Sequence, residues 1–147
     1  MRPLELGATG TLTHLVRVED GAARWGNDLP VLATPVLLWL GEIAAMRAVA
    51  DALQGDEMTV GRSHDAEHVA ATPVGWTVEV TAVLTRVEGR TLHFAVRAQD
   101  AHDVVFTGEH VRSVVSRERF TGRLVRKSAS PVGPGTAHPL GAAAGRP

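Results

Sequence analysis

Hydrophobic and polar residues follow two different periods along this chain, one typical of a helix and one typical of β-strands. Residues 32–53 predict a long helix. On a helical wheel, apolar side chains cover nearly all of its surface, and most of its polar side chains lie in one stripe. That stripe consists of Arg47, Asp51 and Gln54. Thr34, whose hydroxyl can cap, and Pro35, which suits the first helical position, form a start signal, and Gly55 forms a stop signal. We therefore expect one central helix around which the remaining elements are arranged.

Strand patterns flank this helix on both sides. Residues 9–18 alternate over part of their length and predict a first strand. After the helix a period of two returns in residues 58–72, where the alternation is uncertain, and in residues 76–87, 91–100 and 104–116. The connections between these four segments are short, which favours an antiparallel meander with one apolar face available to cover the helix.

This order of elements predicts an α+β hotdog fold, an antiparallel sheet wrapped around one long central helix. We expect residues 1–127 to form this domain. Residues 128–147 are rich in Pro, Gly, Ala and Ser and predict a disordered tail. A single layer of sheet leaves its other face and an edge strand uncovered, so we also expect a homodimer.

Composition and charge narrow the possible partners. The 147 residues carry a formal net charge of -1, so the overall charge does not favour nucleic acid or a membrane surface. No apolar run approaches the roughly 18 residues of a membrane span, and the first residues lack the apolar core of a signal peptide. Cysteine is absent, which excludes disulfides, thiolate metal ligands and a cysteine nucleophile. We expect a cytoplasmic protein with no membrane and no nucleic-acid partner.

Glu42 departs from the polar pattern of the predicted helix. It lies roughly 120–180° around the helix from the polar stripe, among apolar neighbours. A carboxylate on that side faces the core or a cleft, where burial without a partner is costly and where the pKa is readily perturbed. Glu42 is therefore a candidate functional residue. The structural alternative is a glutamate that bends back to solvent or pairs with an arginine.

Two further features stand outside the periodic segments. Trp25 lies among turn-forming residues ahead of the helix, where it is either an anchor on the core, the favoured interpretation, or part of a lid over a pocket. A basic cluster follows the last strand and contains a single acid, Glu118. Its members are Arg117, Arg119, Arg123, Arg126 and Lys127. This cluster is either a solvated basic end or a site for phosphates.

The seven histidines show no metal-binding pattern in the sequence. His64 and His68 would stand about 13 Å apart on one strand, and no other spacing fits a zinc site. We therefore expect no metal and no other cofactor. His68 is distinguished by its place at the end of a strand that should lie beside the helix, although a histidine taken alone is more often structural than catalytic.

Several of these residues recur together in a known family. Thr34, Glu42 and His68, the last followed by Val-Ala-Ala-Thr-Pro-Val-Gly-Trp, resemble the fluoroacetyl-CoA thioesterase family of hotdog enzymes in residue type, order and spacing. The resemblance continues through Val-Glu-Gly-Arg-Thr-Leu at 87–92 and Gly-Glu-His-Val-Arg at 108–112 to the basic cluster, and covers roughly residues 33–127. In that family a threonine, a glutamate and a histidine form the catalytic set at the dimer interface.

The resemblance implies a homodimeric acyl-CoA thioesterase acting on a short acyl group, with Thr34, Glu42 and His68 as its catalytic set and CoA as part of the substrate. One departure concerns residues 19–33, which form a shorter connection than the family's phenylalanine-bearing lid and hold Trp25 as their sole aromatic residue. Because recognition of the fluorinated acyl group is associated with that lid, fluoroacetyl specificity does not follow.

Thioester hydrolysis requires a place for the tetrahedral oxyanion, and the amides at the start of the helix can supply one. Pro35 has no N–H, so the expected donors are Val36 and Leu37. Glu42 would attack the carbonyl directly or activate water, while His68 moves protons and Thr34 positions the acyl group or the water. Eight helical residues separate Thr34 from Glu42 by about 12 Å, so the helix starts later, or the residues bracket the substrate or meet across a dimer.

The substrate is expected to contact two groups of residues, and the sequence also allows two rival functions. Expected substrate-binding residues are Trp25, Val36 and Leu37 near the acyl group, and Arg119, Arg123 and Arg126 for the CoA phosphates. One rival is a non-catalytic hotdog protein that binds an acyl group or another small ligand, since a fold does not fix a function. Another is a hotdog hydratase, but its usual Asp/His loop motif is missing from the sequence.

Overall fold

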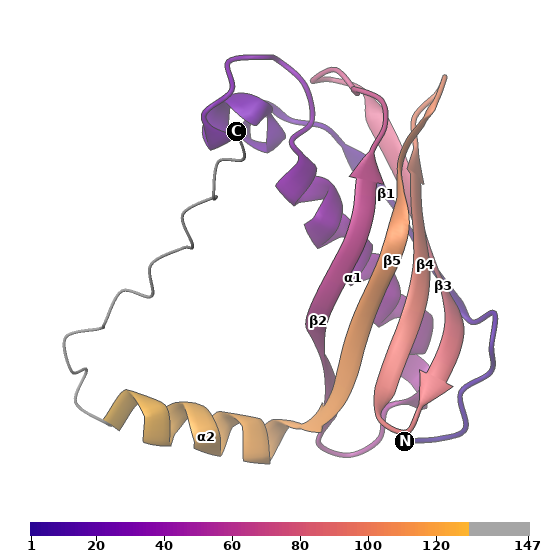
Figure 1. Cartoon of the computed structure of the whole chain (residues 1–147), viewed down its shortest axis with the longest axis vertical. Coiled ribbons are helices and arrows are strands. Elements are labelled where there is room, and N and C mark those ends of the chain that lie inside the picture. Colours follow the sequence, from indigo (N-terminus) through magenta and orange to yellow (C-terminus); the bar gives the residue numbers. More distant parts are fainter. Residues whose placement is uncertain (130–147) are drawn as a thin grey trace, which may run out of the picture.

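Residues 1–129 are described by the structure, a computed structural model, and they form one antiparallel sheet that curves around a central helix (Figure 1). The helix is α1 (Thr34–Val49). The strands are β1 (Thr9–Leu15), β2 (Glu57–His68), β3 (Thr77–Glu88), β4 (Thr91–Gln99) and β5 (Val104–Ser116). They lie in the order β1-β3-β4-β5-β2, with every neighbouring pair antiparallel, so β1 and β2 are the edges. The predicted α+β architecture is confirmed. The predicted four-strand meander is wrong in one respect, because β2 pairs with β5 and not with β3, so only β3, β4 and β5 form a meander.

The core lies between α1 and the concave face of the sheet. The predicted apolar faces of β3 and β4 are buried there, through Val78, Val80, Ala82, Leu84, Leu92, Phe94, Val96 and Ala98. Leu37, Leu40 and Ala44 of α1 pack against them. Close approach of helix and sheet depends on Gly10 in β1, because a Cβ at that position would lie 2.1 Å from the carbonyl oxygen of Ala44.

α1 also has a face that the sheet does not cover. Trp39 is 54% exposed and Met46 is 40% exposed, and half-buried Ile43 lies between them at helical spacing. Apolar side chains therefore surround α1 on both sides, which explains why the sequence shows only a narrow polar stripe. An uncovered apolar face of this kind marks an interaction surface.

A β-bulge interrupts β2 in the middle of its pairing with β5. Gly61 pairs with Arg112 and Ser63 pairs with Val111, so the intervening Arg62 is the extra residue. Without a bulge, Gly61 and His64 would point to opposite faces of the sheet. Because of the bulge, the helix-facing side of β2 carries residues from both parts of the strand. These are Thr59 and Gly61 before the bulge, and His64, Ala66 and His68 after the bulge. The uncertain alternation of residues 58–72 has its cause here.

The segment between β1 and α1 contains two short 3-10 helices, η1 (Val18–Asp20) and η2 (Ala22–Trp25), and a third, η3 (Ala50–Ala52), follows α1. Asp20 is largely buried, and its carboxylate accepts hydrogen bonds from the backbone of Arg17 and the ring of His14. The connection predicted as a loop is thus a compact structure held to the first strand.

A second helix, α2 (Arg117–Ala129), was not expected from the sequence. It begins directly after β5 and extends away from the lower end of the sheet, with none of its side chains buried (Figure 1). Ser128 and Ala129 belong to this helix, so they do not start the predicted tail; residues 130–147 lie outside the described residues. Within residues 1–129, no helix is long and apolar enough to cross a membrane.

Candidate active site

Thr34 and His68 meet where α1 begins and β2 ends. Thr34 Oγ1 lies 2.9 Å from Nδ1 of His68, within hydrogen-bond distance. Thr34 is itself the first residue of the helix, and the N-cap is Ala33, which has no side-chain cap. The predicted capping role of Thr34 is therefore wrong, because its hydroxyl interacts with His68 instead of with the helix backbone. The predicted proximity of this threonine to this histidine is present in the folded chain.

The second ring nitrogen of His68 has no partner among the described residues. Its Nε2 is buried and makes no hydrogen bond within residues 1–129. Burial also lowers the pKa of His68, so the imidazole is neutral at neutral pH. A buried polar atom without a partner is costly and rare in proteins. The nitrogen is thus available to a substrate or to a group supplied by a second protein chain.

A small pocket of about 240 Å³ opens beside the Thr34–His68 pair. Its wall includes Trp25 and Asn27 from the segment ahead of α1, together with Pro35. Trp25 is 58% exposed, so the favoured interpretation of this tryptophan as an anchor on the core is wrong. Its neighbours are mostly turn and 3-10 residues, which hold the indole over the pocket instead of inserting it into the core. Trp25 lines the mouth of the pocket, as in the alternative interpretation.

The amides predicted to bind the oxyanion are already used. The N–H groups of Val36 and Leu37 both donate to the carbonyl oxygen of Ala33, over 3.0 and 3.3 Å. Both side chains are buried in the core. The first turn therefore closes on Ala33, which disfavours these two amides as oxyanion donors, and a contact of Val36 and Leu37 with the substrate stays a prediction. At this helix end Ala33, Thr34 and Pro35 line the pocket, and the N–H of Thr34 precedes the first bonded turn.

Glu42 lies about two turns further along α1 and has two partners of its own. Its Oε2 accepts a hydrogen bond from Nη1 of Arg112 at 3.0 Å, and its Oε1 lies 3.2 Å from Nε2 of His64. Of the alternatives left open by the sequence, pairing with an arginine is the one observed, with 35% of the side chain still exposed. Burial raises the pKa of Glu42, but the hydrogen bonds from His64 and Arg112 and the charge of Arg112 outweigh burial and hold the pKa below its ordinary value.

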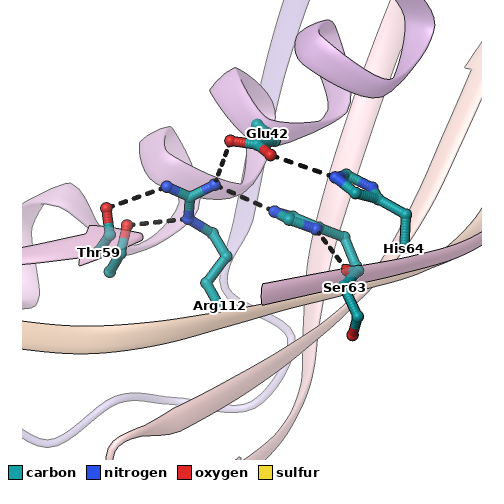
Figure 2. Close-up of polar contacts among 6 residues, drawn as sticks. Glu42, Thr59, Ser63, His64 and Arg112 are labelled. Carbon is teal, nitrogen blue, oxygen red and sulfur yellow. Dashed lines mark hydrogen bonds and ion pairs between the residues drawn. The ribbon is translucent and has the colours of Figure 1, made fainter. Parts of the chain in front are cut away.

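Arg112 is fixed on the side away from Glu42. Figure 2 shows its guanidinium between Glu42 and Thr59, donating to the Thr59 hydroxyl at 2.9 Å and to the Thr59 carbonyl at 3.0 Å. Only 3% of the arginine side chain is exposed. Glu42 is therefore an ionised carboxylate held by a rigid buried cation, which is a suitable environment for a base or a nucleophile.

Sequence reasoning missed Arg112, His64 and His110 as parts of this network. One signal was present: His110 and Arg112 lie on the same side of β5 as the buried Val114. Two polar residues on the inward face of a strand indicate a buried polar cluster. The position of His64 could not be predicted in this way, because the bulge changes the face on which it lies.

Within one chain the predicted catalytic set divides into two clusters. The Thr34–His68 pair lies at one end of α1, and Glu42 lies about 12 Å further along the helix axis. The helix starts at Thr34, so a later start does not remove this separation. The remaining possibilities are a substrate that spans the two clusters or a meeting of residues from two chains.

The basic cluster lies at the other end of the sheet. Arg119 and Arg123 line a cavity of about 520 Å³ with Phe120 and Arg90, and both arginines also face a second hollow of about 490 Å³ together with Arg126. In Figure 1, α2 extends from the lower end of β5, whereas α1 begins and β2 ends at the upper end. The basic cluster and the Thr34–His68 pair of one chain are thus far apart.

A sheet wrapped around a central helix is the hotdog fold, and the comparisons with known proteins assign this chain to the thioesterases of that fold. The chain is a thioester hydrolase, and residues 16–118 match the family described as "Fluoroacetyl-CoA-specific thioesterase". It belongs to this family.

Individual relatives agree with this assignment. A fluoroacetyl-CoA thioesterase of Streptantibioticus cattleyicolor is 41% identical over 98 residues, which are 67% of this chain and 70% of the relative. A solved structure of a mutant of FlK in complex with acetyl-CoA is 32% identical, with a TM-score of 0.81 over 85% of this chain and 99% of that one. A thioesterase superfamily member from Thermus thermophilus, 23% identical with a TM-score of 0.82 over 87% and 96% of the two chains, shows the same fold.

Proposed function

We propose that this protein hydrolyses the CoA thioester of a short acyl group. The observation that carries the proposal is the Thr34–His68 pair, which faces a pocket of about 240 Å³ at the start of α1. A pocket of that size admits a small acyl group. The relatives support a CoA ester, since one is a fluoroacetyl-CoA thioesterase and the structure of another was solved in complex with acetyl-CoA. We propose that neither a metal nor an organic cofactor takes part; a cytoplasmic location stays a prediction.

In the proposed reaction Glu42 acts as general base. Its carboxylate takes a proton from water while the water oxygen forms a bond to the thioester carbon. The tetrahedral intermediate then collapses, the carbon–sulfur bond breaks, and the proton passes to the leaving thiolate. His68 contacts the acyl carbonyl or the leaving group through its unpartnered Nε2, and Thr34 holds the other nitrogen of the imidazole. The lowered pKa of Glu42 keeps its carboxylate ionised, as a proton acceptor must be, and neutral His68 can donate or accept a hydrogen bond.

We propose that one active site is built from two chains. β2 is an edge strand, and α1 has an uncovered apolar face that includes Trp39 and Met46. Antiparallel pairing of β2 with the same strand of a second copy extends the sheet and covers this apolar face. Such pairing also sets the end of one β2 beside the beginning of the other. It would therefore bring the Thr34–His68 pair of one chain toward Glu42 and α2 of the partner.

The two-chain site predicts complementation between inactive variants. We expect a homodimer mass by light scattering, and we expect that mixing inactive Glu42→Gln with inactive His68→Ala restores activity. Random exchange of subunits gives half of the dimers one intact site, so about a quarter of wild-type activity should return. A chain carrying both substitutions, mixed with wild-type protein, is the control for exchange. A monomer, or a mixture that stays inactive despite exchange, contradicts the proposal.

The basic cluster predicts a difference between substrates with and without the nucleotide. Reversing charge at Arg119, Arg123 and Arg126 together should raise KM for acyl-CoA by about tenfold or more, because guanidinium groups bind phosphates through charge-assisted hydrogen bonds. The same variant should leave KM unchanged for the N-acetylcysteamine thioester, which has no phosphates. Reversal of the exposed Arg24 serves as a control for charge alone. An equal rise in KM for both substrates would mean that the basic cluster is a solvated surface and does not bind the CoA phosphates.

The short connection ahead of α1 predicts weak selectivity among small acyl groups. Residues 19–33 provide one aromatic residue over the pocket, Trp25, which is more than half exposed. A hydrophobic pocket distinguishes one small substituent by only about 1–3 kcal/mol, or 10- to 200-fold. We therefore expect thiol release from several short acyl-CoAs, with at most a modest preference for fluoroacetyl-CoA over acetyl-CoA. A ratio of kcat/KM of about 10⁴ or more would contradict this expectation, and no release from any ester would contradict the proposed function.

A further inference from the structure

His64 lies next to Glu42 on the side opposite Arg112. Its Nε2 is 3.2 Å from Oε1 of the carboxylate, whereas Arg112 contacts Oε2 (Figure 2). A carboxylate can only accept a hydrogen bond here, so Nε2 of His64 carries the hydrogen. Each oxygen of Glu42 therefore has one donor, and the two donors come from different strands. This arrangement fixes the plane of the carboxylate, which a single donor would leave free to rotate.

The ring of His64 is itself held in place by His110. The two imidazoles are stacked with their centroids 4.0 Å apart and their planes 12° from parallel. Nδ1 of His110 donates to the carbonyl of Ser63 at 3.0 Å, and its Nε2 accepts from Nη1 of Arg112 at 3.0 Å. Burial lowers the pKa of His110 to about 4, so it is neutral at neutral pH. His64 thus lies on an uncharged ring whose orientation is set at both nitrogens.

The backbone of β2 makes room for this contact. A Cβ on Gly61 would lie 2.7 Å from Oε1 of Glu42, so only glycine leaves space for the carboxylate. The bulge that follows turns His64 to the helix-facing side of the strand. Gly61 lets the strand lie close to Glu42, and the bulge at Arg62 turns His64 toward the helix. Together they allow the imidazole of His64 to reach the carboxylate of Glu42.

The same side chains could in principle hold a metal ion. Ligand atoms of Glu42, His64 and His110 all lie within 4.8 Å of one another. Nη1 of Arg112, however, is 3.0 Å from both Glu42 Oε2 and His110 Nε2. A buried guanidinium therefore already occupies the position of the cation, and its charge would repel a metal ion. The geometry favours a hydrogen-bond network over a metal site.

We infer that His64 is a positioning residue for the hydrolytic reaction, which holds the carboxylate of Glu42 in its reactive orientation together with Arg112. The inference rests on the proposed role of Glu42 as general base. Loss of the His64 donor leaves Glu42 attached to Arg112 but free to turn away from the water. The rate of the chemical step should then fall, while binding of the substrate, which His64 does not contact, should change little.

Three substitutions separate the donor from the bulk of the ring. His64→Phe keeps an aromatic ring that can stack on His110 but has no donor, His64→Ala removes both, and His64→Gln keeps an N–H near the position of Nε2. We expect kcat to fall by about tenfold or more in the Phe and Ala variants, with KM within about threefold of wild type. His64→Gln should retain activity within about threefold of wild type.

A shift in the pH profile gives a second readout. The hydrogen bond from His64 helps to lower the pKa of Glu42, to which Arg112 and His110 also contribute. Removal of this bond in His64→Phe raises the pKa of Glu42. Because the ionised carboxylate is the active form, the step of the acid limb that belongs to Glu42 should move to higher pH, while the step that belongs to His68 should stay in place. A residue that only stabilised the fold would not move this limb.

His93 offers a matched control elsewhere in the sheet. Its Nε2 lies 3.2 Å from a carboxylate oxygen of Glu88, the same distance as in the His64–Glu42 pair. His93→Phe should therefore leave kcat, KM and the acid limb unchanged. Thermal unfolding of every variant identifies any that fail to fold, and His64→Gln keeps the test decisive if His64→Ala is among them.

The outcomes separate this inference from the proposed function. If Glu42→Gln is inactive and His64→Phe has wild-type kcat, the inference is overturned while the role of Glu42 stands. If Glu42→Gln keeps wild-type activity, the general-base role fails first. Equal losses in His64→Gln and His64→Phe would also overturn the inference, as would loss of activity in EDTA that Zn²⁺ restores, which would make the cluster a metal site. The inference is supported if His64→Phe lowers kcat in the wild-type protein but has no further effect on kcat when Glu42→Gln is already present.

Discussion

Glu42→Gln is expected to lower kcat by about 10²- to 10⁴-fold, the range typical of a lost general base. Glutamine has nearly the same size and keeps an oxygen that can accept from Arg112, but it has neither the negative charge nor the basicity of the carboxylate. Binding of the CoA ester should change little, because Glu42 acts on water and not on the nucleotide. Steady-state kinetics and binding of a non-hydrolysable acyl-CoA thioether measure the two effects separately.

Glu88 provides the control for this substitution. It too lies between a histidine and an arginine, His93 and Arg86, but on the exposed outer part of the sheet. Glu88→Gln should therefore behave like wild type in both assays. Thermal unfolding must accompany Glu42→Gln, because weakening the partner of the buried Arg112 costs stability. Wild-type kcat in a folded Glu42→Gln protein would exclude Glu42 as the base.

His68→Ala is expected to lower kcat by a similar factor, about 10²- to 10⁴-fold. The substitution removes the buried Nε2 and the partner of the Thr34 hydroxyl in one step. Thr34→Val should lose less, because it leaves the imidazole in place and only removes its hydrogen bond. A loss below about tenfold in His68→Ala would return this histidine to a structural role.

The pH dependence provides a second test of His68. Burial lowers its pKa, and the neutral ring is the form proposed to act. It gains a proton, and activity is lost, as the pH falls through this lowered pKa. The acid limb of kcat/KM should therefore lie below the pH at which an ordinary histidine titrates, about 6.5. An acid limb above that value would contradict the assignment.

The sequence predicted the existence of the central helix and of the hairpins β3–β4 and β4–β5, because the helix is a long apolar segment and the strands alternate clearly. It did not predict that β2 pairs with β5, nor that the helix ends at Val49 ahead of the stop signal at Gly55. Residues 34–49 and the alternating faces of β3 and β4 lie where the pattern predicted them. α2 was missed because its larger apolar residues, Phe120, Leu124 and Val125, are outnumbered by basic ones, and the segment was interpreted by charge alone. Its apolar and basic residues do separate onto two sides with a helical period, so a signal was present in the sequence.

The candidate site could be predicted only in part, for reasons that differ by residue. Thr34 and His68 were grouped through the resemblance to a known family, and their contact lies where the start of α1 meets the end of β2. The partners of Glu42 depended on the register of β2 against β5, which no local pattern specifies. Free amides at the start of the helix were expected because Thr34 was predicted to be the N-cap. In the structure Ala33 is the N-cap, and its carbonyl oxygen accepts hydrogen bonds from the amides of Val36 and Leu37.

The bulge at Arg62 makes the site depend on how many residues precede it in β2, and not only on which residues they are. If Arg62 instead took a regular place in the ladder with β5, the two faces of the strand beyond it would be exchanged. Asp65 and Glu67 would then point toward α1 in place of His64 and His68, with two acids set against an apolar core. A length change in β2 that the bulge does not absorb should therefore be far more harmful in evolution than one in the turns, where the phase of the strands is preserved.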